Sequence, residues 1–328
     1  PGVKPPGRDS GGDDRIIHHI FDGGWFGVLP FDESASLERG MACVGLSLDI
    51  RKYPLDESIA PQDEFNSFVE QFPSIREQFS EFVPIDDWTR TEQIQYSSAK
   101  AAGTGWVMTS DTYGFIDTLL SRGRVNSFES VYYIARALAD AVRRDDYSLG
   151  TFECLNEMQH QQIDATDKMV STAYASFSDF RLWNAWFNLW LGDKLLNDLY
   201  LTQGWMKAKA GDYSFFDRID RAARADLSAS FSRRVEIVLG AVEEAQNALS
   251  DGAISAGEAA DRVCNLVGTA DWLPYRVYAG LGFAGDADAA DTVLQKRVMD
   301  WVRSSAPAWL RKDLFDYIPS RLTESVPK

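Results

Sequence analysis

Residues 105–130 read GWVMTSDTYGFIDTLLSRGRVNSFES, and this stretch decides the fold. Its pattern predicts a buried strand, a tight polar turn and then the start of a long helix. Asp111 is expected at the strand end, Gly114 and Gly123 in the turn, and Asn126 at the helix cap. Because a helix N-terminus carries unpaired N–H groups and partial positive charge, this arrangement suits a large polar cofactor.

The helix after the turn is predicted from its apolar spacing. Apolar residues recur there at intervals of three and four, which predicts a helix with one apolar face. These residues are Val125, Phe128, Tyr132, Ala135, Ala139 and Val142. Asn126 and Glu129 have the spacing of a capping box at its start. Almost everything after residue 150 also has helical patterning.

The segments before residue 105 predict a small sheet and two helices. Strands are expected over residues 15–21, 25–31 and 41–50, and they would form an antiparallel sheet. Helical spacing over residues 61–82 predicts two helices divided at Pro73. Trp106–Thr109 is expected to be a short buried strand. The fold class is therefore α+β, a small and mostly antiparallel sheet followed by a large helical C-terminal region.

The same patterns divide the chain into three parts. Residues 1–14 are rich in Pro, Gly and charge and are expected to be a flexible tail or a cut loop. Residues 15–148 hold the sheet and the cofactor turn, and residues 149–328 form a helical C-terminal domain.

Charge and composition exclude several classes of function. The 328 residues include 33 Lys and Arg against 49 Asp and Glu, a net charge of −16 that disfavours nucleic-acid binding. No apolar run is long enough to span a membrane. Cys43, Cys154 and Cys264 lie far apart, so we expect no zinc site and a cytoplasmic location.

Other motifs have simpler interpretations. Residues 280–285 match G-x-G-x-x-G, but no clear strand precedes them, so a helix connection is expected. His18 and His19 would point to opposite faces of a strand. Glu153, Glu157 and His160 have helical spacing and are expected on a solvated face rather than around a metal. The aromatic residues of 181–201 are expected in the core, with one or two as walls of an aromatic-substrate pocket in the alternative.

The cofactor segment resembles the second flavin-contacting motif of flavin-dependent halogenases and related FAD monooxygenases. The usual pattern there is Gly-Asp-Ala-x-Gly-Phe-Ile-Asp-Pro-Leu-Phe-Ser-x-Gly, and residues 110–123 here read SDTYGFIDTLLSRG. Residues 24–30, GWFGVLP, look like the Trp-x-Trp-x-Ile-Pro box of halogenases. Residues 95–98, QYSS, and 176–185, SFSDFRLWNA, are also similar to family blocks.

The resemblance implies a fold and a cofactor. An FAD-binding domain would carry an inserted substrate sheet, and a helical region would follow. The family's early G-x-G-x-x-G turn and its catalytic lysine have no counterpart here, so we expect the C-terminal two-thirds of such an enzyme, with a partial FAD-binding region. Without the pyrophosphate site, weak or no FAD binding is expected of this part by itself.

The resemblance also implies an activity. Reduced FAD supplied by a reductase, O2 and chloride or bromide would give hypohalous acid, which reaches a small electron-rich aromatic or carrier-bound substrate. The cofactor-binding residues would be Asp111, Gly114, Phe115, Ile116, Ser121, Arg122 and Gly123. The residues separating flavin from substrate would be Trp25, Gly27, Leu29 and Pro30.

Three departures from the family pattern leave alternatives open. Thr118 replaces the motif Pro, and Gly27 replaces the second Trp of the box. Leu120 stands where tryptophan halogenases have a catalytic Glu, which favours a phenol, a pyrrole or a carrier-bound substrate over free tryptophan. A wall opened at Gly27 would favour an FAD monooxygenase, a hydroxylase or epoxidase of the same fold. The third alternative is a non-catalytic helical binding or assembly module.

Overall fold

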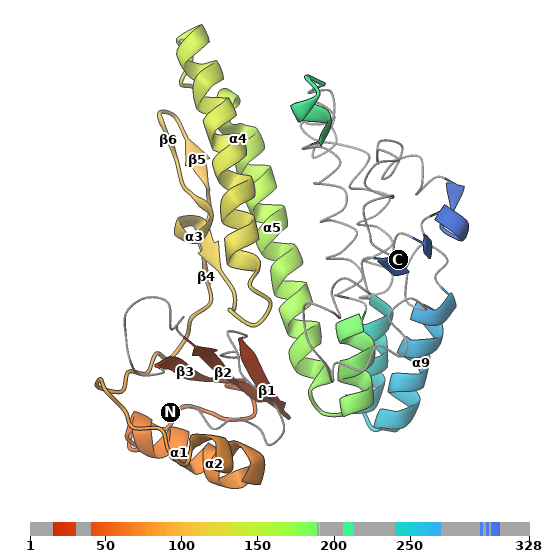
Figure 1. The fold of residues 1–328 in the computed structure, drawn as a ribbon. Coiled ribbons are helices and arrows are strands. Elements are labelled where there is room, and N and C mark those ends of the chain that lie inside the picture. The colour runs from red at the N-terminus through yellow and green to blue at the C-terminus, as the bar shows by residue number, and fades with distance from the viewer. Residues whose placement is uncertain are drawn as a thin grey trace. The chain divides into compact units, whose positions relative to one another are not determined.

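The computed structural model describes residues 16–30, 41–188, 190, 206–212, 240–269, 296–297, 300–301 and 303–308 (Figure 1). The chain divides into two compact units, residues 1–178 and 179–328. This division differs from the one predicted at residue 148, which remains a prediction about domains. The predicted tail, residues 1–14, lies outside the described residues.

The first unit begins with the predicted antiparallel sheet. Its strands are β1 (Ile17–Phe21), β2 (Gly24–Pro30) and β3 (Ala42–Leu48), in the order β1-β2-β3. Phe21 pairs with Gly24 and Ile20 with Trp25. Because side chains alternate along a strand, Phe21 and Phe26 share one face of the sheet, and His18 and Trp25 share the other. The three predicted strands are confirmed.

Two short helices cover one face of this sheet. They are α1 (Pro61–Gln71) and α2 (Pro73–Phe79), each with a proline in its first turn, where a missing N–H costs nothing. The predicted division at Pro73 is confirmed. The buried core between the helices and the sheet consists of Phe21, Phe26, Phe65, Phe68, Val69 and Ile75.

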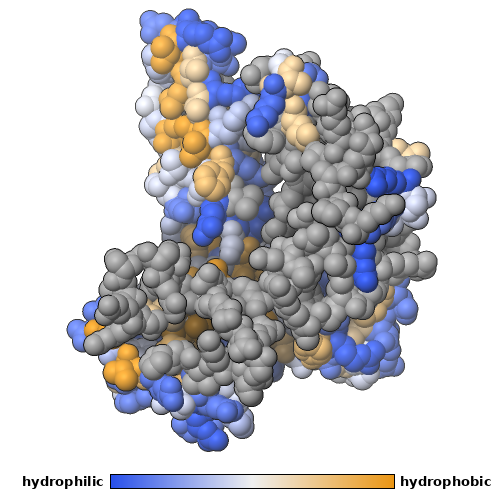
Figure 2. Space-filling view, viewed as in Figure 1, coloured by the Kyte–Doolittle hydropathy of each residue, from blue (hydrophilic) through white to orange (hydrophobic). Residues whose placement is uncertain are grey.

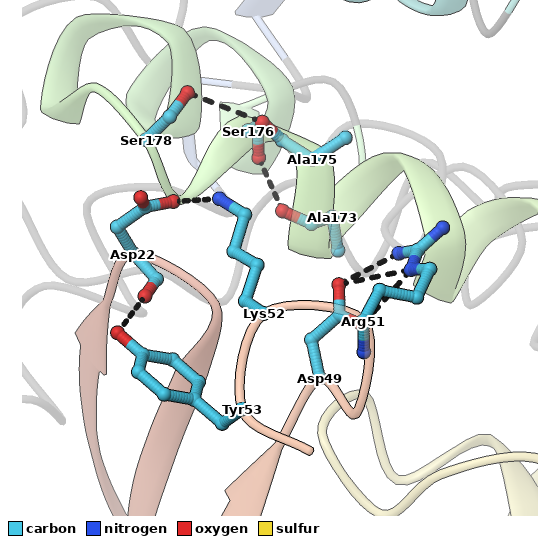
Figure 3. Close-up of polar contacts among 9 residues, drawn as sticks. All are labelled: Asp22, Asp49, Arg51, Lys52, Tyr53, Ala173, Ala175, Ser176 and Ser178. Atoms are coloured by element: carbon cyan, nitrogen blue, oxygen red, sulfur yellow. Dashed lines mark hydrogen bonds and ion pairs between the residues drawn. The ribbon is translucent and has the colours of Figure 1, made fainter.

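The turn between β1 and β2 is held by the loop after β3. Lys52 forms an ion pair with Asp22, and the Tyr53 hydroxyl donates to the Asp22 carbonyl at 3.0 Å. Arg51 makes a bidentate contact with Asp49 at 2.7–3.2 Å. Figure 3 shows these bonds, together with hydroxyl-to-carbonyl bonds in the last turns of α5 (Leu149–Ser176).

Short strands and a one-turn helix lead to the long helices. They are β4 (Tyr96–Ser97), β5 (Ala102–Gly103), β6 (Trp106–Val107), α3 (Ser110–Tyr113) and β7 (Gly114–Phe115). β4 pairs with β7, and β5 pairs with β6. The predicted buried strand at Trp106 is therefore a two-residue hairpin strand. The predicted burial of this strand was wrong for Trp106, which is 44% exposed and whose ring lies against Gly103 of the neighbouring strand.

The long helices α4 (Arg122–Arg144) and α5 pack together, as Figure 1 shows. Their apolar core consists of Ala102, Ile134, Ala141, Phe152 and Leu155. Beside it, Gln162 donates to Glu129 at 2.7 Å, and the buried Asn126 lies 3.4 Å from the Thr166 hydroxyl. The surface that α4 buries against α5 is thus partly polar.

The apolar face predicted for this helix is not the face that α4 buries. Phe128 is 72% exposed and Val142 is also exposed, so the apolar stripe faces solvent. The buried face of α4 instead holds Ile134 and Ala141, which belong to the apolar core shared with α5. The buried polar residues of α4 are Asn126 and Ser130. Figure 2 shows hydrophobic side chains gathered over this helix at the upper left. The exposed large apolar residues of α4 are Phe128, Val131, Leu138 and Val142, and they are called its exposed stripe below.

The described part of the second unit is helical. Leu182 and Trp186 are buried, so the core interpretation is confirmed for Trp186, while the other described aromatic residues of the segment are half-buried. α9 (Ala256–Thr269) begins with a capping box, in which Ser255 and Glu258 exchange hydrogen bonds at 2.8–3.2 Å. Among the described helices of the chain, none is both long and apolar enough to cross a membrane. The α+β class is confirmed.

Two phenylalanine substitutions test where the core lies. Phe26→Ala removes a fully buried ring between sheet and helices and should lower the free energy of unfolding by about 3–5 kcal/mol. Phe128→Ala on the exposed stripe should change it by less than about 0.5 kcal/mol. Urea denaturation followed by circular dichroism measures both. Equal losses would show that α4 buries Phe128 in solution.

Candidate flavin-binding turn

Asp111 lies in the one-turn helix α3 rather than at a strand end. The strand β6 ends at Val107, and α3 begins three residues later. Asp111 is exposed, and the Tyr96 hydroxyl donates to its backbone carbonyl. The predicted strand end was wrong because residues 110–113 close a helical turn before β7 pairs with β4. Asp111 therefore presents its carboxylate from a helical turn.

The turn before α4 is closed by a buried carboxylate. Asp117 is 3% exposed, and its Oδ1 accepts the Leu119 N–H at 2.7 Å. Ser121 has left-handed backbone angles, φ 53° and ψ 24°, and is the N-cap of α4 without a side-chain bond. The predicted cap at Asn126 was wrong, since α4 begins at Arg122. The first N–H groups of α4 thus have no side-chain cap.

The two motif glycines differ in role. A Cβ at Gly114 would come within 3.1 Å of Ile163 and of the Tyr96 carbonyl, so β7 packs closely at this glycine. A Cβ at Gly123 would lie 3.5 Å from Asp111 Oδ1 and 3.8 Å from the Phe115 ring. The structure therefore brings Asp111, Phe115 and Gly123 together at the start of α4.

Arg122 adds a hydrogen-bond donor without a partner among the described residues to the first turn of α4. Its Nε is buried and has no hydrogen-bond partner among the described residues, while its NH2 lies 3.4 Å from Asn126 Oδ1. Buried donors without partners are rare because each costs free energy. With the uncapped N–H groups of α4, this donor forms a set that suits an anionic group.

The Trp-box residues lie along β2. Trp25 is 4% exposed, and its ring is tilted against the His18 ring at 4.7 Å between centroids. A Cβ at Gly27 would come within 2.8 Å of Trp25 Cζ3, so the indole lies against the glycine. Leu29 is exposed, and Pro30 ends the strand. The space above Gly27 is therefore occupied by Trp25.

A largely buried hydrogen-bond chain joins the box to the turn. Trp25 Nε1 donates to the Tyr174 hydroxyl at 2.9 Å, and this hydroxyl donates to Asp117 Oδ2 at 2.9 Å. Sequence reasoning missed Tyr174, because a single tyrosine within a long helical pattern gives no signal of a partner 149 residues away. The chain connects β2, α5 and the turn before α4.

Burial dominates the electrostatics of this chain. Removal of Asp117 from water raises the pKa of its carboxyl above the ordinary value of 3.8, although hydrogen bonds from Leu119, Tyr174 and Thr118 oppose the shift. Burial and the nearby Asp117 raise the pKa of the Tyr174 hydroxyl as well. Tyr174 therefore stays protonated and can donate to Asp117.

The remaining sequence candidates lie away from the turn before α4 in the sequence. His18 and His19 lie on opposite faces of β1, as the strand pattern predicted. His160 lies 3.3 Å from Asp164 and 3.4 Å from the Tyr113 hydroxyl. Within the described residues, no group of His, Cys, Asp and Glu is arranged to hold a metal ion. The motif at residues 280–285 lies outside the described residues.

Comparison with known proteins agrees with the motifs. The chain is 34% identical over 312 residues to the monodechloroaminopyrrolnitrin halogenase PrnC of Pseudomonas fluorescens, over 92% of this chain and 54% of PrnC. It is 34% identical over 213 residues to the tetracycline 7-halogenase of Kitasatospora aureofaciens, over 63% of this chain and 38% of that protein. No model of a protein family matches the chain.

Solved structures give the same result. The halogenase PltM matches with a TM-score of 0.68 and 26% identity, over 77% of this chain and 51% of PltM. A structure of PltM in complex with phloroglucinol and FAD matches equally well. The chain belongs to the flavin-dependent halogenase family, and the resemblance in its motifs is confirmed. It spans about half the length of PrnC and PltM.

The buried carboxyl predicts a pH effect on stability. Because the pKa of folded Asp117 is raised, its contribution to stability is present below pH 3.8 and is lost as pH rises through the folded value. The stability of Asp117→Asn relative to the unsubstituted protein should therefore increase as pH rises. Urea midpoints over a pH series measure this difference.

Asp49 provides a control of opposite sign. The hydrogen bond from Arg51 lowers the pKa of Asp49, so its contribution is present above the ordinary value and is lost as pH falls. The stability of Asp49→Asn relative to the unsubstituted protein should decrease as pH rises. Two variants with the same pH slope would contradict the assignment.

Proposed function

We propose that the protein provides the second flavin-contacting motif and the substrate sheet of a flavin-dependent halogenase. Membership of the halogenase family supports this proposal, and so does the donor set at the start of α4. The partners proposed are a flavin reductase and chloride or bromide, and the location proposed is cytoplasmic.

The donor set fits a large anionic cofactor such as FAD. The observation that carries this fit is the buried Arg122 Nε without a partner among the described residues, in the first turn of the uncapped helix α4. The Asp111 carboxylate lies beside Gly123 in the same turn of α4. Asp111 would accept hydrogen bonds from FAD hydroxyls. The remaining residues proposed to bind the cofactor are Gly114, Phe115, Ile116, Ser121, Arg122 and Gly123.

The residues of the turn would bind and orient the flavin and would exclude water from it. FAD supplies, when bound in reduced form, the electrons that activate O2 for oxidation of a halide. The N–H groups at the start of α4 would hold negative charge there, on the halide or on the anionic flavin. Buried Ile116 and Leu120 back the turn and keep water from it.

The substrate proposed is an electron-rich aromatic compound, free or carrier-bound. Two relatives are halogenases named for monodechloroaminopyrrolnitrin and tetracycline, and PltM has been solved in complex with phloroglucinol; all three are aromatic compounds. Leu120 in place of a catalytic Glu favours a phenol or pyrrole over free tryptophan, because activated rings need less help from a general base. This choice of substrate rests on the motif.

Trp25, Gly27, Leu29 and Pro30 are proposed to separate flavin from substrate. The monooxygenase alternative drew its support from a wall opened at Gly27. The indole of Trp25 occupies that space, so the geometry favours halogenation over direct oxygenation.

An assay of the native-length gene product tests the function. The enzyme receives FAD, a flavin reductase with NADH, O2 and phloroglucinol, with or without bromide. A brominated product that requires bromide is expected. An oxygenated product formed equally without bromide would indicate the monooxygenase. Absence of product and of any yellow FAD complex would indicate the non-catalytic module.

Asp111→Ala tests the proposed cofactor site in the same enzyme. Loss of a charge-assisted hydrogen bond should weaken FAD binding by about 1.5–3 kcal/mol. Thr112→Ala is the control, because this residue is exposed in the same turn of α3. Flavin fluorescence titration measures both, and equal affinities would mean that Asp111 does not contact FAD.

A further inference from the structure

One indole fills the place of two in the Trp box. The family pattern has a second Trp at the position of Gly27, two residues after Trp25 on the same face of β2. Here Trp25 Cζ3, Cη2 and Cε3 lie 2.8, 3.5 and 3.6 Å from the position of a Cβ at Gly27. The ring therefore leans along the strand into the space that a second side chain would use.

The direction of this ring is set at its nitrogen. Trp25 Nε1 donates to Tyr174, and the ring edge on the other side meets Gly27. A tryptophan has two side-chain torsions, and one hydrogen bond combined with one close contact fixes both. Burial of the ring excludes water as a replacement partner for Nε1.

Tyr174 is itself fixed by the turn. Its hydroxyl donates to Asp117 Oδ2, while Asp117 Oδ1 holds the Leu119 N–H. The Tyr174 ring also packs against Phe177 at 5.0 Å between centroids. Tyr174 thus transmits the position of the turn before α4 to the ring on β2.

We propose that Tyr174 is a positioning residue for the halogenation reaction, holding Trp25 across Gly27 so that one indole closes the wall between flavin and substrate. This role rests on the proposed function. Tyr174 contacts neither flavin nor substrate in this scheme and acts through Trp25. Gly27 is the second element of the device, because any larger side chain would displace the ring.

The first experiment measures the ring directly in the 328-residue chain. The indole N–H signal of Trp25 is assigned in ¹H–¹⁵N spectra by its loss in Trp25→Phe. Tyr174→Phe keeps the aromatic ring but removes the acceptor, so this signal should move and its solvent exchange should rise about tenfold. Tyr53→Phe, which removes a hydroxyl bond to Asp22 elsewhere, should leave it unchanged.

Gly27→Ala displaces the same ring from its other end. The added Cβ would lie 2.8 Å from Trp25 Cζ3, so this variant should also move the Trp25 signal although the Tyr174 hydroxyl is intact. It provides a second test if Tyr174→Phe fails to fold. An unmoved Trp25 signal in a folded Tyr174→Phe or Gly27→Ala variant would overturn the positioning.

The second experiment uses the native-length enzyme and measures halogenated product per NADH oxidised. In Tyr174→Phe and Gly27→Ala this ratio should fall about tenfold, the effect of one lost hydrogen bond, while the FAD affinity stays unchanged. A ratio unchanged in both variants would overturn the role in the reaction. Parallel losses of FAD affinity and product would reduce Tyr174 to a structural residue.

The two experiments separate the proposals. If the unsubstituted enzyme forms no halide-dependent product, the proposed function fails and the role in halogenation fails with it. The Trp25 signal still reports whether Tyr174 positions the ring.

Discussion

The buried hydrogen bonds between Trp25, Tyr174 and Asp117 are the constraint on which the first unit depends. They join a sheet strand, the turn before α4 and the long helix α5, whose residues lie 149 and 57 positions apart in the sequence. Trp25 and Asp117 are buried and Tyr174 is half-buried, so a displaced partner leaves a donor or acceptor poorly satisfied. The sheet, the turn and the helix must therefore be placed together.

Three features that each cost free energy lie in the turn before α4. Asp117 is a buried carboxyl with a raised pKa, Ser121 has left-handed backbone angles, and Arg122 Nε has no partner among the described residues. Each feature alone would lower the stability of an ordinary connection between a strand and a helix. Their concentration within six residues separates this turn from the rest of the described first unit and coincides with the family motif.

The sequence predicted the parts of the fold that depend on local pattern. The alternation in β1, β2 and β3 and the break at Pro73 need only neighbouring residues, and both are confirmed. The buried face of α4 could not be predicted from its own periodicity. Its apolar stripe is regular, but α4 buries the face that holds Ile134 and Ala141, which pack in one core with residues of α5.

The candidate site shows the same division. Asp111 and Gly123 were predicted to lie together from the motif, and the structure places them side by side. The helical turn α3 was missed because four residues carry too little periodicity. The compensation of Gly27 by Trp25 was missed because a glycine in the sequence indicates missing volume and does not show which neighbour fills it.

The exposed stripe of α4 has a consequence for the colloidal behaviour of the protein. With a net charge of −16, copies of the chain repel one another at long range in dilute buffer. Salt shortens the range of that repulsion to about 8 Å near physiological strength, while the attraction between apolar side chains remains. Phe128, Val131 and Val142 would then meet their counterparts on other copies. Solubility should thus decrease as salt is added, the reverse of salting-in.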